Sequence, residues 1–112
     1  MQHASLTTER WAAFAPGQRL LMIANELNRA SARMAPEDGR SRRLSYERAL
    51  RLTDLTIQLA DRPGLRRELL RWRDLLAELY LAEEPRAEAH RDVLRALLLL
   101  SPITATQLSI LG

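Results

Sequence analysis

Proline placement constrains the fold of this chain more than any other feature of its sequence. The five prolines stand at positions 16, 36, 63, 85 and 102. Proline has no backbone N–H to donate and breaks the interior of a helix, but it suits the first helical turn. We therefore predict long helices over residues 16–34, 41–60, 63–81 and 85–100. We also predict two short helices, one capped by Thr7 or Thr8 and ending at Phe14, the other beginning at Ser101 and ending at Leu111.

Residues suited to a β-sheet are scarce. The 112 residues include one Val, four Ile and six Thr, whereas Leu, Ala and Arg, which favour helices, account for half of the chain. This composition excludes all-β and α/β folds. Short connections make consecutive helices antiparallel. We expect a single all-α domain over residues 1–112, an up-down bundle with a short N-terminal helix in 1–15, a four-helix core in 16–100 and a short apolar C-terminal helix in 101–112.

The balance of residue types is that of a folded globular protein, with 46% hydrophobic and 28% charged residues. Because the chain has no Cys, disulfides, thiolate metal sites and thiol catalysis are excluded. The first nine residues lack the basic start and apolar stretch of a secretory signal. No apolar run approaches the roughly 20 residues that span a bilayer. We expect a cytoplasmic protein with no membrane partner.

Motifs of catalytic, cofactor or metal sites are missing from the sequence. The four Gly stand singly, so none forms a phosphate-binding loop, and helix-borne di-iron sites need more than His3 and His90. Glu88 and Asp92 lie two residues either side of His90, which points them away from its ring on a helix. We predict no catalytic, cofactor-binding or metal-ligating residues, and a protein that is not an enzyme.

His90 has three readings: a hydrogen-bonded core residue, a residue of a partner interface, or a pH-sensitive group. We favour the core residue, because buried polar groups usually find partners. The segment from Arg86 to His90 resembles the Arg-to-His motif of the HEPN ribonucleases, a family of small helical proteins. Its spacing is one residue shorter than in that motif, so we transfer no activity from it.

Arginine supplies all 17 basic residues, and the formal net charge is +3. Clusters of Arg can contact phosphates, and the candidates here are Arg40, Arg42, Arg43, Arg66 and Arg67. They stand before or at the starts of two successive helices, which an up-down bundle places at opposite ends. Acidic residues three or four positions away also pair with many of the Arg. We therefore favour a solvated surface, and a nucleic-acid-associated regulator is the alternative function.

A second sequence feature bears on DNA binding. Residues 97–112 resemble the first half of the helix-turn-helix of winged-helix regulators, at Ile103, Leu108, Leu111 and Gly112. The resemblance implies a DNA-associated protein, although the helix that would read the major groove is missing from the sequence.

Leucine is in surplus. A surface helix needs an apolar arc of roughly 100°, and the apolar positions of residues 41–60 cover more than twice that arc. Of four consecutive Leu at 97–100, Leu99 must point outward, and the uncharged stretch after them adds Ile103, Leu108 and Leu111. We predict a helical interaction protein that uses these four residues to self-associate, as a homodimer by default, or to bind another protein.

Overall fold

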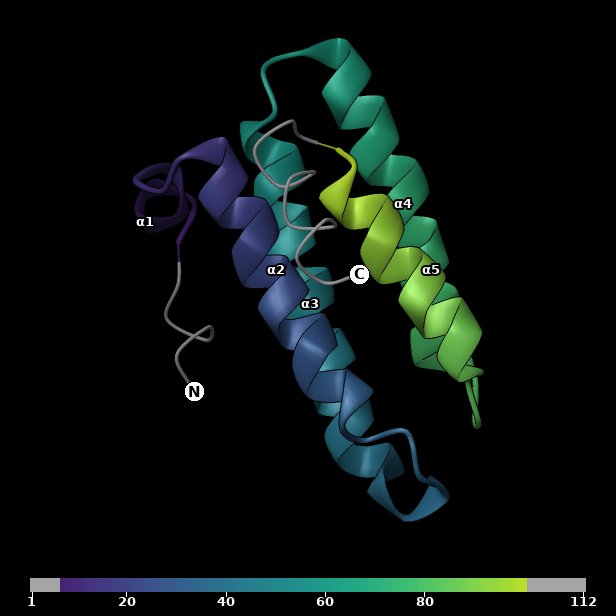
Figure 1. Cartoon of the computed structure of the whole chain (residues 1–112). Coiled ribbons are helices and arrows are strands. Elements are labelled where there is room, and N and C mark those ends of the chain that lie inside the picture. The colour runs from purple at the N-terminus through teal and green to yellow at the C-terminus, as the bar shows by residue number, and fades with distance from the viewer. Residues whose placement is uncertain (1–6, 101–112) are drawn as a thin grey trace.

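The computed structural model describes residues 7–100, which form helices and connections without any strand. In chain order the elements are α1 (Thr8–Ala12), α2 (Pro16–Ser31), the 3₁₀ turn η2 (Pro36–Asp38), α3 (Gly39–Leu59), α4 (Pro63–Leu81) and α5 (Ala87–Leu98) (Figure 1). The all-α prediction is confirmed. The short helix predicted after Ser101 lies outside the described residues.

The prolines mark the helix boundaries closely. Pro16 and Pro63 occupy the first positions of α2 and α4, as expected. Helix α2 ends at Ser31, three residues earlier than predicted, with Ala32 as its C-cap, and Ala35 before Pro36 is extended (φ −66°, ψ 147°).

The starts of α3 and α5 each differ by two residues from the prediction. Helix α3 begins at Gly39, since the turn of η2 delivers that residue already in the helical conformation (φ −53°, ψ −38°). Helix α5 begins at Ala87 because Arg86, the residue after Pro85, is extended (φ −74°, ψ 139°).

The four long helices form a closed ring. Contacts join α2 to α3, α3 to α4, α4 to α5 and α5 back to α2, and successive helices run in opposite directions (Figure 1). Each contributes fully buried leucines to the centre, for example Leu27, Leu52, Leu76 and Leu97. Helix α1 packs on α3, where Trp11 is buried and its indole N–H donates to Thr56 Oγ1 at 2.8 Å. The result is the predicted four-helix bundle.

Helix α3 departs from the expected leucine-rich interior. Its buried face carries small and hydroxyl side chains, such as Ala49, Thr53 and Thr56, and Leu44 is exposed. The two Thr hydroxyls donate to carbonyls one turn earlier, both at 2.7 Å, so they are satisfied without an external partner. Helix α3 packs against α1, α2 and α4 and has more buried residues than any other described helix. No described helix combines the length and the apolar character needed to cross a membrane.

Candidate functional site

The lines along which neighbouring helices meet differ in how side chains connect them, and we call these lines seams. In the α2/α3 seam, Glu26 is only 2% exposed and lies between two guanidinium groups. Arg48 Nε donates to its Oε1 at 3.0 Å, and Arg29 Nη1 lies 3.3 Å from its Oε2. A buried carboxylate needs such partners to offset its lost hydration. Glu26 therefore ties α2 to α3.

The α2/α5 seam is tied by a chain of neutral hydrogen bonds. Burial raises the pKa of Tyr46 to about 12, so its hydroxyl keeps the proton and donates to His90 Nδ1 at 2.8 Å. On the other side of the ring, His90 Nε2 and Ser31 Oγ are 2.8 Å apart, and Ser31 donates its own proton to the Leu27 carbonyl at 3.1 Å. With Ser31 donating to Leu27 and Tyr46 donating to Nδ1, the matching tautomer of His90 carries its proton on Nε2.

This arrangement supports the favoured reading of His90. The residue is 4% exposed and joins α2, α3 and α5, so the hydrogen-bonded core histidine is confirmed. Burial lowers the pKa of His90 and favours the neutral ring. Arg86, the other residue of the ribonuclease-like segment, lies on a different surface, along the seam between α4 and α5.

The position of Arg42 contradicts the prediction that it contacts anions. It is 1% exposed, and its Nη1 and Nη2 atoms donate to the carbonyls of Arg33 (3.0 Å) and Glu83 (2.9 Å), with Ala35 at 3.4 Å. Carbonyls left over at helix ends attract a cation in this way. Arg42 fastens the ends of α2 and α4 to the start of α3, so its side chain cannot reach a phosphate.

The four other predicted anion contacts are exposed but do not form one surface. Arg40 and Arg43 lie at the start of α3, and Arg66 and Arg67 lie at the start of α4. Figure 1 shows these two helix starts at opposite ends of the bundle. The structure therefore separates the Arg clusters, as the up-down topology predicts.

The α3/α4 seam is closed on its outer side. Arg73 donates through Nε and Nη2 to the two carboxylate oxygens of Asp54, and the Tyr80 hydroxyl donates to Glu47 at 3.0 Å. The hydrogen bond to Asp54 raises the pKa of Arg73 above its ordinary value. These contacts cover the apolar interior with polar groups.

The α4/α5 seam is hollow. A groove of about 440 Å³ runs along it, which we call the α4/α5 groove. Its floor is apolar and consists of Leu75, Leu79, Ala82, Pro85, Ala89 and Val93. Among the described residues, no hydrogen bond or ion pair joins a side chain of α4 to a side chain of α5. The buried Trp72 crosses the seam beneath the surface, where its Nε1 donates to the Val93 carbonyl at 2.7 Å. Leu75 remains 44% exposed.

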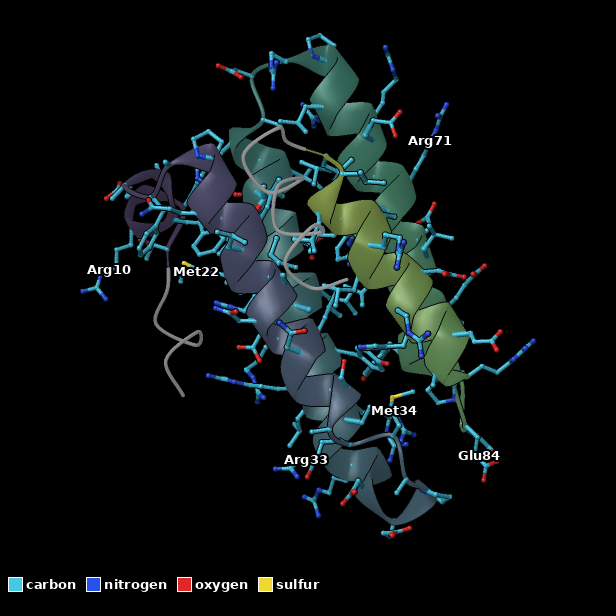
Figure 2. All side chains as sticks on the ribbon, viewed as in Figure 1. Arg10, Met22, Arg33, Met34, Arg71 and Glu84 are labelled. Atoms are coloured by element: carbon cyan, nitrogen blue, oxygen red, sulfur yellow. The ribbon has the colours of Figure 1, made fainter. Side chains whose placement is uncertain are left out.

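Charged groups stand on the edges of the α4/α5 groove. They are Glu78 on α4, Glu84 and Arg86 on the connection, and Asp92 on α5. Figure 2 shows Glu84 on that connection, at one end of the bundle. Arg86 pairs with Glu88 at 3.3 Å, whereas no ion pair or hydrogen bond engages the other three side chains within residues 7–100.

No protein-family model, curated protein or solved structure matches this chain. The site is therefore interpreted from its own geometry. Among the described residues, no group of three or more His, Asp or Glu could hold a metal ion.

The predicted partner residues have mixed outcomes. Leu99 is 60% exposed, so its outward direction is confirmed. It is the C-cap residue of α5, seven residues after Asp92, and does not line the α4/α5 groove. Ile103, Leu108 and Leu111 lie outside the described residues.

The groove itself was missed from the sequence. Helical spacing places Leu75 and Leu79 on one apolar face of α4, and that pattern alone assigns them to the core. The available signal is the small size of Ala82 and Ala89, which face this seam from opposite sides and leave space between the helices.

Proposed function

We propose that this chain is a non-enzymatic protein that binds another protein through the α4/α5 groove. The observation that supports the proposal is the contrast between seams. The other three are tied by polar side chains that reach across them, while this one exposes an apolar hollow of about 440 Å³. A hollow of this kind is a typical place for a partner to insert apolar side chains.

Burial of the groove floor supplies the energy for binding. Each Å² of apolar surface removed from water contributes about 25 cal/mol. Leu75 is nearly half exposed, and its neighbours on the floor leave a depression into which a partner's side chain can fit without rearranging the bundle. A preformed site of this kind limits the entropy cost of binding.

An enzymatic role has less support. Of the described residues, the two whose pKa burial changes most clearly are Tyr46 and His90, and both are engaged with each other inside the core. The ionisable groups of the groove stand on its exposed rim, where water screens them. A nucleic-acid role is also disfavoured, because three of the four charged rim residues are acidic.

The proposal is tested by selecting binders from a display library of helical peptides on the intact protein. Selected peptides are then measured against Ala89→Arg, which puts a long charged side chain on the groove floor. Ala89 is exposed and lies in the first turn of α5, so the substitution leaves the core intact. We expect most selected peptides to lose at least tenfold in affinity for Ala89→Arg.

Ala32→Arg is the matched control, because Ala32 is equally exposed but lies at the end of α2, away from the groove. Peptides should bind this variant as they bind the unmodified protein. Binders that are indifferent to Ala89→Arg, or a selection that yields none, would refute the groove as a docking surface.

A further inference from the structure

We infer that the partner is a basic amphipathic helix of a different protein, which lays its apolar face into the α4/α5 groove between rows of acidic side chains. This inference rests on the proposed function, because it names the occupant of the same groove.

The dimensions of the groove fit a helix. Along α4 its lining extends from Leu75 to the C-cap Ala82, seven steps of the chain that span about 10 Å at 1.5 Å per residue. An amphipathic helix docked in a groove presents anchors at positions i, i+3 or i+4, and i+7, which cover the same distance. The antiparallel α4 and α5 form the two banks, and the floor between them is lined by the small residues Ala82 and Ala89.

The charge of the rim favours a basic partner. Glu78 stands on one bank, Asp92 on the other and Glu84 at the end where the helices connect. The single cation on the rim, Arg86, already pairs with Glu88. The groove is therefore acidic although the chain as a whole has a net charge of +3. Lys or Arg on both flanks of a docked helix would face these carboxylates.

The same charges argue against two other occupants. In a two-fold homodimer a surface meets its own copy. Two acidic rims would then face each other, and like charges would oppose the contact. The C-terminal residues 101–112 carry no charged side chain, so they cannot complement the rim. A basic helix satisfies both the apolar floor and the acidic edges.

Two fluorescein-labelled probes test the inference. Both are 16-residue helical peptides with the same three Leu anchors at i, i+4 and i+7; one has Lys at all flanking positions and the other has Glu. At low salt we expect fluorescence anisotropy to show the Lys peptide binding the intact protein at least tenfold more tightly than the Glu peptide. The difference should shrink at high salt, because salt screens exposed charges.

A charge-reversed protein provides the decisive comparison. In Glu78→Lys/Asp92→Lys the preference should reverse in favour of the Glu peptide. Glu37→Lys/Asp61→Lys is the matched control, with the same change in net charge at exposed or loop positions outside the groove. It should retain the preference of the unmodified protein.

Three results would overturn the inference: a Glu peptide that binds as tightly as the Lys peptide, a preference that the charge reversal leaves unchanged, or no binding of either peptide. Each is separable from a failure of the proposed function. If Ala89→Arg abolishes binding of two equally tight peptides, the groove still docks a helix and only the basic partner is refuted. If selected library peptides ignore Ala89→Arg, the docking function itself is refuted.

Discussion

Tyr46→Phe removes one oxygen atom from the centre of the bundle and tests whether the Tyr46, His90 and Ser31 chain of hydrogen bonds is formed. In the structure the Tyr46 hydroxyl donates to His90 Nδ1 at 2.8 Å, and both residues are buried. The substitution leaves the ring in place but deprives Nδ1 of its donor. Rotating the ring cannot easily restore the balance, because Nε2 already donates toward Ser31.

The expected cost follows from the buried acceptor left unpaired. Such a group costs about 1–3 kcal/mol, while the missing hydroxyl leaves too small a hole to add a large cavity cost. For a domain of this size, 1 kcal/mol lowers the melting temperature by roughly 4 °C. We therefore expect Tm to fall by about 4–12 °C.

Urea unfolding at pH 7.5, followed by tryptophan fluorescence and far-UV circular dichroism, measures the change in unfolding free energy. Tyr80→Phe is the control, because it makes the same chemical change where the hydroxyl donates to Glu47 on the surface. That variant should not differ measurably from the unmodified protein, since water replaces the lost partner. Equal effects of the two substitutions would refute the buried hydrogen bond, and with it the neutral His90 that the chain requires.

Three further predictions concern the buried His90, the buried Arg42 and the exposed Leu99. Burial lowers the pKa of His90 below its ordinary value of 6.5, so near and below pH 6.5 the unfolded chain binds more protons than the folded one. The unfolding free energy should therefore fall as the pH decreases from 7 to 5.5. This fall should be weaker in His90→Gln. Arg42→Met should cost at least about 2 kcal/mol because three carbonyls lose a charged donor, whereas Arg43→Met, which changes an exposed side chain, should leave urea unfolding unaltered. Leu99→Glu should change the unfolding free energy by less than about 0.5 kcal/mol, and a cooperative loss of structure, seen by circular dichroism, would show that Leu99 faces the core.

Local rules predict the helices of this chain well because their signals are local. Pro63 suits the first helical turn, and the predicted helix over 63–81 is observed with those bounds. The errors have the same local origin. Helix α2 ends three residues before its predicted end, and Gly39 enters α3 because the preceding turn is already helical.

Contacts between helices join residues far apart in the sequence, so they are harder to predict from the sequence than the helices themselves. The position of His90 on an inward face could be predicted, but its partners Tyr46 and Ser31 are 44 and 59 residues away and depend on how three helices are arranged. Arg42 illustrates the same limit. Its neighbours Arg40 and Arg43 are exposed, and only the approach of the Glu83 and Arg33 carbonyls distinguishes it from them.

The surplus of leucine acquires functional meaning only from its surroundings. Leu44 and Leu70 are at least as exposed as Leu75. Leu44 lies one helical turn from Glu47, and Leu70 lies one turn from Arg73. Glu47 and Arg73 form the polar contacts that close the α3/α4 seam, so a partner at this surface would meet polar groups. Leu75 instead borders a hollow whose facing residues are Ala and Val. An exposed leucine beside a closed seam needs no explanation, whereas Leu75, beside an open apolar seam with acids on both banks, supports the proposal that a basic partner binds there.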